Sequence, residues 1–158
     1  MRTLVLGLGN DLIADDGLGL FAARALAETH GHLADVVETG LAGLALLDFF
    51  LDYDRALVID AIQTGTHPPG TILAIRGDEL SAVVAPSPHY AGLPEMFALA
   101  QGMGLAFPRD VRILAMEVAD AATIGGGLTP AVATALPALI ARAGAMVENW
   151  PEEVTTDA

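Results

Sequence analysis

Apolar residues along the chain fall into short runs separated by longer segments with helical spacing. The runs TLVLGLG (3–9) and RALVIDAI (55–62) are apolar almost throughout, which is typical of strands buried on both faces of a sheet. Three further segments, DVVET (35–39), TILAIRG (71–77) and RDVRILAMEV (109–118), are also predicted to be strands. The pattern therefore predicts a sheet of about five strands.

The segments between these strands place apolar residues at helical intervals. Helices are predicted over residues 17–29, 42–51, 93–104 and 128–149. Asp16 stands where the N-cap of the first helix is expected, and Thr129 followed by Pro130 is a favourable start for the last.

Strands that alternate with helices are typical of a parallel sheet with helices on both faces. The link between the third and fourth predicted strands, QTGTHPPG (63–70), is short and rich in turn residues, so this pair is expected to be antiparallel. The predicted fold is a three-layer α/β/α sandwich around a mainly parallel, about five-stranded sheet with one antiparallel strand. We expect a single domain over residues 1–150 and an acidic, disordered tail over 151–158.

Composition narrows the range of functions. The mean hydropathy of +0.53 suggests a membrane protein, but the longest uncharged apolar stretch, residues 128–141, contains two prolines and is too short to cross a bilayer. The N-terminus lacks the three regions of a signal peptide, so a cytoplasmic protein is expected. The chain has no cysteine, which leaves only oxygen and nitrogen ligands for any metal.

The charge is strongly acidic. Twenty acidic residues stand against seven basic ones, which gives a formal net charge of −13. A nucleic-acid-binding protein needs a basic surface, so this class is disfavoured. Most of the acidic residues are expected to be solvated surface groups.

Three residues follow predicted strands or precede a helix, where ligands bind in open parallel sheets. Asp16 follows the first strand, Asp60 ends the third, and His89 lies in SPHYAGLPE before the third helix. Taken singly, Asp16 is explained as an N-cap, Asp60 as an Asx-turn and His89 as a loop histidine. Together, two carboxylates and one imidazole form a ligand set that suits nickel, zinc or manganese.

Two other kinds of site fit the sequence less well. Gly7 and Gly9 match the start of a dinucleotide-binding G-x-G-x-x-G motif, but position 12 is leucine and two aspartates follow, which would repel a pyrophosphate. The only serines, Ser81 and Ser87, lie outside any G-x-S-x-G motif of a serine hydrolase.

Five blocks of the chain resemble, in order, the hydrogenase maturation endopeptidases, which trim a C-terminal tail from the large subunit of nickel-iron hydrogenases. These blocks are GLGNDLIADDGLG, ETGLAGLALL, ALVIDAIQTGTHPPGTILAIRGDEL, SPHYAGLPEMFALAQGMG and VRILAMEVADAATIGGGLTPAVATALP. The similarity covers nearly the whole chain apart from the last eight or so residues.

The resemblance implies that Asp16, Asp60 and His89 bind the metal and serve as the catalytic residues. It further implies that Gly9 and Asn10 shape the cleft, and that Gly40 and Gly43 form a second glycine-bearing loop nearby. The chain departs from the family where an aspartate followed by glycines is common, because Glu38 and Thr39 stand there. A direct role for Glu38 is therefore doubtful.

The resemblance also implies that nickel arrives already bound to the precursor, so no tightly bound cofactor is expected in the protease. The expected partner is the large-subunit precursor, with no nucleic acid and no membrane insertion. The oligomeric state is left open, with a monomer slightly favoured. Two alternatives remain: a module that binds the nickel-loaded precursor without cutting it, and a nucleotide-binding α/β protein.

Overall fold

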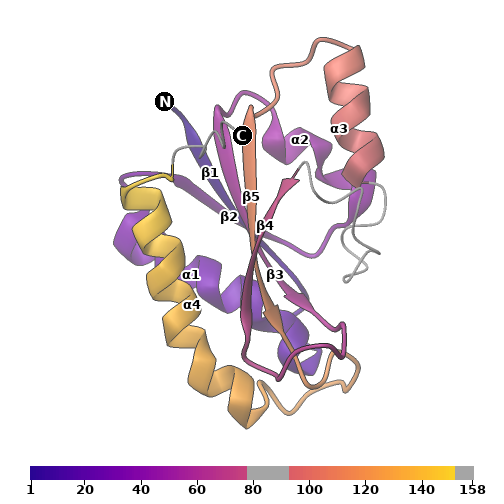
Figure 1. Ribbon diagram of the computed structural model, residues 1–158, viewed down its shortest axis with the longest axis vertical. Coiled ribbons are helices and arrows are strands. Elements are labelled where there is room, and N and C mark those ends of the chain that lie inside the picture. Colours follow the sequence, from indigo (N-terminus) through magenta and orange to yellow (C-terminus); the bar gives the residue numbers. More distant parts are fainter. Residues whose placement is uncertain (78–92, 152–158) are drawn as a thin grey trace, which may run out of the picture.

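The computed structural model describes residues 1–77 and 93–151. Five strands form one sheet in the order β2-β1-β3-β5-β4 (Figure 1). The strands are β1 (Thr3–Leu8), β2 (Asp35–Thr39), β3 (Arg55–Ile62), β4 (Ile72–Arg76) and β5 (Asp110–Glu117). Pairing is parallel from β2 through β1 and β3 to β5, and β4 runs antiparallel to β5. The predicted mainly parallel sheet with one antiparallel strand is confirmed. The predicted pairing of the third and fourth strands is wrong, because β4 pairs with β5 and not with β3.

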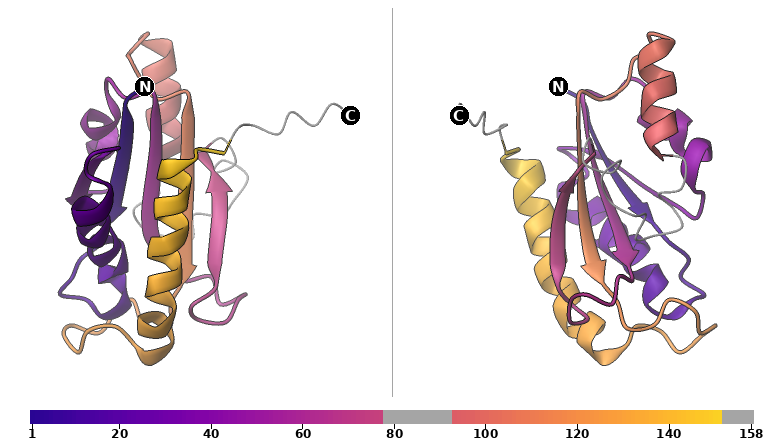
Figure 2. Two further views of the ribbon diagram at one scale, coloured as in Figure 1. Left: turned by 90° about the vertical axis from the view of Figure 1, so that its left-hand side faces the viewer. Right: turned by 45° about the vertical axis from the view of Figure 1, so that its right-hand side comes forward.

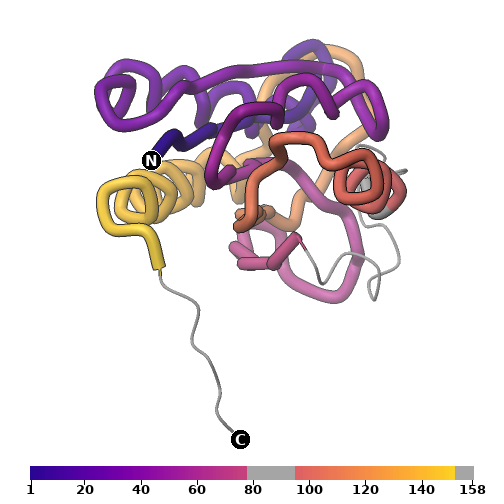
Figure 3. Tube along the Cα trace, turned by 90° about the horizontal axis from the view of Figure 1, so that it is seen from above, coloured from indigo at the N-terminus to yellow at the C-terminus, as the bar shows by residue number. Residues whose placement is uncertain are grey.

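Helices cover both faces of the sheet. The elements are α1 (Leu18–His30), α2 (Leu47–Phe50), α3 (Leu93–Gly102), α4 (Pro130–Glu148) and the short 3₁₀ helices η1 (Ala14–Gly17) and η2 (Gly43–Leu46). In the right-hand view of Figure 2, α4 and α3 lie on opposite sides of the strands. Seen from above in Figure 3, the same two helices are again well apart. The three-layer architecture is therefore as predicted.

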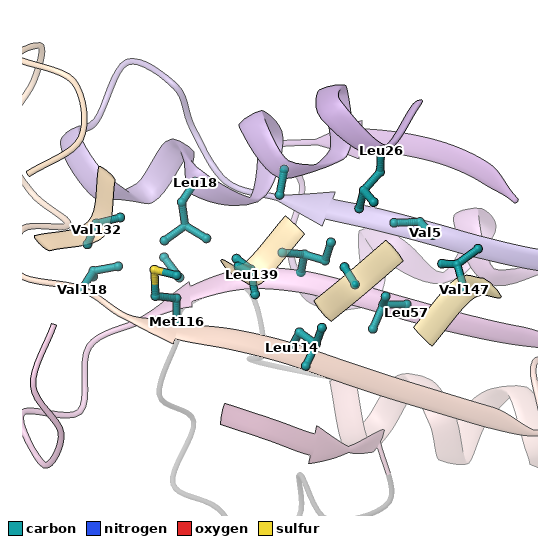
Figure 4. Close-up of a cluster of buried hydrophobic side chains, with 14 of the residues drawn as sticks. Val5, Leu18, Leu26, Leu57, Leu114, Met116, Val118, Val132, Leu139 and Val147 are labelled. Carbon is teal, nitrogen blue, oxygen red and sulfur yellow. The ribbon is translucent and has the colours of Figure 1, made fainter. Parts of the chain in front are cut away.

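Each face of the sheet has its own apolar core. On one face, side chains of β1, β3 and β5 such as Val5, Leu57 and Leu114 pack against α1 and α4 (Figure 4). On the other face, their neighbours in sequence pack against η2, α2 and α3, with Phe50 and Met96 fully buried. Because successive side chains of a strand point to opposite faces, a strand that serves two cores must be apolar throughout.

Helix α1 packs closely on the sheet where Gly19 of the helix meets Gly7 of β1. A Cβ atom on Gly19 would come within 2.6 Å of the carbonyl oxygen of Ile59 in β3. A Cβ atom on Gly7 would lie 2.7 Å from Cβ of Ala23 in α1. These glycines of the first signature block therefore serve close helix–sheet packing, not a phosphate.

Some predicted boundaries were wrong. The single helix expected over residues 42–51 is η2 followed by the one-turn α2, and Gly43 at its start has a φ of 57°, which favours glycine.

Helix α4 begins at Pro130 as predicted, and it continues unbroken through Pro137 to Glu148. By length and composition α4 could cross a membrane, yet its residues Val132, Leu139, Ala143 and Val147 are buried in the core against the sheet.

Candidate functional site

The four parallel strands β1, β2, β3 and β5 all end at one edge of the sheet, here called the carboxyl edge. After β1 the chain crosses to β2 on one side, and after β2 it returns to β3 on the other side of β1. The strand order therefore reverses between β1 and β3. In open α/β sheets ligands bind outside the carboxyl ends of the strands at such a reversal.

Asp16 lies at this reversal, in the 3₁₀ helix η1 that follows β1. Its side chain is partly exposed, and its backbone N–H donates to the carbonyl of Ile13 at 2.9 Å. The expected N-cap role is wrong: Gly17 occupies the N-cap of α1, and no side chain caps this helix. The structural explanation that competed with a functional role for Asp16 is thereby removed.

Asp60 lies in β3, with its side chain on the α2–α3 face of the sheet. Its alternation with Ile59 and Ala61 places it on the same face as Val58 and Ile62. The residue is fully buried, and its Oδ1 accepts the N–H of Ala61 at 2.8 Å. Asp60 does not end the strand as predicted, because β3 continues to Ile62.

Asp16 and Asp60 are brought to the same edge because η1 packs against β3. His89, the third member of the predicted set, lies outside the described residues. Within residues 1–77 and 93–151, no three His, Cys, Asp or Glu side chains gather closely enough to hold a metal ion. A metal site built on Asp16 and Asp60 would therefore need a ligand from outside those ranges.

The neighbouring Asp15 has a different role, which the sequence did not reveal. Its carboxylate is fully buried. It accepts the backbone N–H groups of Ala119 and Asp120 at 3.1 and 3.0 Å, and that of Thr129 at 2.7 Å. The hydroxyl of Thr129 also donates to it, at 2.8 Å. Asp15 thus joins η1 to the connection between β5 and α4.

Gly9 and Asn10 shape the turn between β1 and η1. Gly9 has a φ of 149°, and a Cβ atom there would overlap the backbone carbonyl oxygen of Asp16. Its N–H donates to Thr39 at the end of β2 at 3.2 Å. Asn10 turns the chain by accepting the N–H of Leu12 on its side chain at 3.0 Å. Only glycine at position 9 lets the chain pass this close to Asp16.

Glu38 is engaged by an arginine at the carboxyl edge. Nε and Nη2 of Arg24 in α1 donate to its two carboxylate oxygens at 2.8 and 3.0 Å. The same Nη2 donates to Asp11 at 2.9 Å. Hydrogen bonds to Glu38 and then Asp11 raise the pKa of Arg24 above its ordinary value. Glu38 therefore holds the β2 end against α1, which agrees with the doubt about a direct catalytic role.

Glu117 is a second buried acid that the sequence reasoning did not propose as functional. It ends β5 opposite Ile62, on the same face of the sheet as Asp60. Its carboxylate accepts the N–H of Thr64 at 2.8 Å and a short hydrogen bond from the Thr64 hydroxyl. The available signal was a charged residue directly after the apolar run 113–116 of β5. Its contacts indicate that it fixes the chain that leaves β3.

Asp120, a further acid at the carboxyl edge, is partly exposed and caps its own loop. It accepts the N–H groups of Ala122 and Thr123 at 2.9 Å. Hydrogen bonds from Thr123 and Ala122 lower the pKa of its carboxyl below the ordinary value. The carboxyl edge therefore keeps a negative charge here at neutral pH.

A cavity of about 540 Å³ lies elsewhere, at the opposite edge of the sheet. Phe97, Phe107, Arg109 and Asp110 contribute to its walls. Because Asp110 begins β5, this cavity is far from the carboxyl edge where Asp16 and Asp60 lie. It is not part of the candidate site.

Comparison with known proteins identifies the family. Residues 22–145 match the family model described as hydrogenase maturation protease. The chain is 36% identical over 162 residues to the hydrogenase expression/formation protein HupD of Rhodobacter capsulatus, an alignment that covers 99% of this chain and 76% of that protein. The chain belongs to the hydrogenase maturation protease family. It is a peptidase.

Relatives from Escherichia coli support the same assignment. The chain is 29% identical over 163 residues to the hydrogenase 2 maturation protease, covering 100% of this chain and 98% of that one. The solved structure of the hydrogenase maturating endopeptidase HybD superposes with a TM-score of 0.78 at 28% identity, covering 94% of this chain and 93% of that chain. As a maturation protease, the chain carries the family fold with Asp16 and Asp60 at its carboxyl edge.

Proposed function

We propose that this maturation protease removes the C-terminal segment of a hydrogenase large-subunit precursor that already carries nickel. In this proposal Asp16, Asp60 and His89 bind the nickel of the precursor and are the catalytic residues. The observation that carries the proposal is the placement of Asp16 and buried Asp60 together at the reversal of strand order, in a chain of this family.

The two aspartates offer different carboxylates to such a substrate. Asp16 is partly exposed on η1, so an incoming chain reaches it directly. Asp60 is buried, and a buried carboxylate interacts more strongly with a cation because less water screens it. Oxygen and imidazole ligands suit a divalent transition metal such as nickel.

Hydrolysis of the amide requires an activated water and stabilisation of negative charge on the carbonyl oxygen. A carboxylate of this pair can accept a proton from the attacking water. Nickel held by the substrate can polarise the scissile carbonyl or make the water more acidic. Since the precursor holds the ion, the protease needs no strong metal affinity of its own, and we infer that it is purified largely free of metal.

The decisive experiment compares apo and nickel-loaded precursor. The protease is first stripped with a chelator and its metal content measured, and cleavage is then followed by intact mass. Cleavage only of the loaded precursor is expected. Efficient cleavage of the apo precursor would overturn recognition of substrate nickel, and stoichiometric, tightly held zinc would favour a conventional metallopeptidase.

Variants of the three residues test their assignment. Asp16→Asn, Asp60→Asn and His89→Ala should each lower the cleavage rate by roughly 10²-fold or more. Asp48→Asn on α2 and His67→Ala, both exposed, are matched controls and should cleave at the wild-type rate. A variant of the set that binds the precursor and still cleaves it normally would remove that residue from the site.

The alternative of a non-cleaving binding module is decided by the same assay. Wild-type protein that binds the loaded precursor and leaves its mass unchanged would favour that alternative. We further propose that the protease acts in the cytoplasm, as a monomer. Sedimentation of the purified protein tests the oligomeric state.

A further inference from the structure

The loop that carries Asp16 is tied to a distant part of the chain through its neighbour Asp15. Two backbone N–H groups at the end of β5, those of Ala119 and Asp120, donate to Asp15 Oδ2. At the start of α4, the N–H and hydroxyl of Thr129 donate to the same carboxylate. In the opposite direction, the N–H of Asp15 donates to the carbonyl of Asp120 at 2.9 Å.

These contacts are hydrogen bonds to a buried charge, which are more specific than apolar packing. A fully buried carboxylate loses its hydration and stays favourable only when several donors replace the water. Asp15 receives three N–H groups and one hydroxyl from residues 104 to 114 positions away. Its negative charge also lies at the N-terminus of α4, where the helix dipole favours an anion.

The hydroxyl of Thr129 binds Asp15 and does not cap its own helix. Thr129 occupies the N-cap of α4, where a threonine hydroxyl commonly accepts an N–H of its own helix. No side-chain cap hydrogen bond is formed, and the hydroxyl donates to Asp15 at 2.8 Å instead. The Thr129 hydroxyl thus connects the first turn of α4 to η1, while the backbone of that turn is closed by the N–H of Ala133, which donates to the Thr129 carbonyl at 2.9 Å.

A second contact holds the other end of the same loop. The N–H of Gly125 donates to the carbonyl of Leu12 at 2.8 Å, and Ile13 forms an isolated β-bridge to Ile124. Residues 12–15 are therefore held at both ends by the connection 119–129. The loop is supported on one side by β1 and on the other by this connection.

We propose that Asp15 is a positioning residue that fixes the carboxylate of Asp16 for the reaction. Asp15 and Asp16 are joined by one rigid peptide plane, and their Cα atoms are about 3.8 Å apart. Hydrogen bonds that hold the side chain and the N–H of Asp15 therefore also fix the direction in which the side chain of Asp16 points. Misplacement of a reacting group by about 1 Å can cost 10²-fold in rate. This inference rests on the proposed function of Asp16 at the reacting centre.

The direct variant, Asp15→Asn, places an amide donor against backbone donors and can prevent folding. Substitutions of its partner Thr129 disturb the same contact less. Thr129→Val keeps the shape of the side chain and removes only the hydroxyl donor, while Thr129→Ser retains that donor. The valine variant should lower kcat for the loaded precursor about tenfold with little change in KM, because positioning acts on the reaction step. The serine variant should restore kcat.

Gly144→Ala in α4 controls for loss of stability alone, because a Cβ there meets the His30 ring, away from η1. This variant should keep the wild-type kcat. A Thr129→Val variant that melts at a lower temperature with unchanged kcat would overturn the positioning role.

A measurement that needs no cleavage separates this inference from the proposed function. The side-chain carboxyl carbon of Asp16 is assigned by NMR and its chemical shift compared in the three proteins. We expect the chemical shift of Asp16 to change in Thr129→Val and to match the wild-type value in Thr129→Ser. If the wild type fails to cleave and the displacement is nonetheless observed, the function fails and the positioning stands. If the Asp16 signal does not move in Thr129→Val, the positioning is wrong whatever the protein cleaves.

Discussion

Arg24 in α1 and Glu38 at the end of β2 form an ion pair with two hydrogen bonds, 2.8 and 3.0 Å long. Glu38 stands at the position where the resemblance to the family led us to expect an aspartate. Both side chains are well exposed, so water screens their attraction. The contact therefore orders the carboxyl edge without contributing much to the stability of the domain.

Glu38→Gln should accordingly have little effect on precursor cleavage. The amide oxygen still accepts from Arg24, and the rate of precursor cleavage should stay within about threefold of the wild type, not fall by the roughly 10²–10⁴-fold that loss of a general base costs. Intact-mass assays with loaded precursor measure the rate, with Asp16→Asn as the inactive reference. A loss as large as that of Asp16→Asn would make Glu38 part of the catalytic machinery.

Glu117→Gln should destabilise the fold. The buried carboxylate accepts two hydrogen bonds from Thr64, and an amide keeps one acceptor and turns an N–H group toward the other donor. The amide N–H at this buried position would then lack an acceptor, and leaving a buried polar group unsatisfied costs about 1–3 kcal/mol of unfolding free energy, measurable by urea denaturation. Asp48→Asn, on an exposed site, should change that free energy by about 0.5 kcal/mol or less. Equal effects of the two changes would contradict the structural role of Glu117.

Gly144→Ala and Gly102→Ala should change the stability of the fold in opposite directions. A Cβ atom on Gly144 would lie 2.7 Å from the ring of His30, which hydrogen bonds to Thr29 and Glu148 hold in place. Overpacking of this kind costs about 1–3 kcal/mol. At Gly102, in the last turn of α3, nothing lies within 4 Å, and alanine should stabilise by about 0.5 kcal/mol. Thermal unfolding of both variants checks the signs, and a stabilising Gly144→Ala would mean that the His30 ring moves aside freely.

Asp110 should contribute to stability in a pH-dependent way. Burial by itself would raise the pKa of its carboxyl, but hydrogen bonds from Arg112 and Trp150 and the nearby arginines outweigh it, and the pKa is lowered from 3.8. A lowered pKa in the folded state means that the ionised form stabilises the fold above the unfolded pKa. This contribution is lost as the pH falls through the folded value.

Asp110→Asn should therefore destabilise the protein at neutral pH and lose its effect in acid. The free energy of unfolding of variant and wild type should differ above about pH 4 and converge below it. Asp48→Asn provides the exposed control. A difference that is independent of pH would show that shape, and not charge, matters at this position.

The local pattern was sufficient for the architecture. Strands that are apolar on both faces can only be buried between two layers, so β1 and β3 were predicted from their own residues. The link after β3 is too short for a helical crossover, so the antiparallel direction of β4 was also predicted. Its partner was not, because β4 pairs with β5 and not with the preceding strand β3. Pro130 also marked the start of α4 from local chemistry alone.

The roles of the two adjacent aspartates were decided only by tertiary structure. Asp15 and Asp16 are the same residue type in one turn, and the local sequence favoured Asp16 as the cap. Which carboxylate is buried depends on donors from residues 119–129, more than 100 positions away. The hydrogen bonds to buried Glu117 likewise come from Thr64 in another connection. Periodicity reports which side of an element faces the core, whereas a hydrogen bond between distant loops depends on where the folded chain brings its ends together.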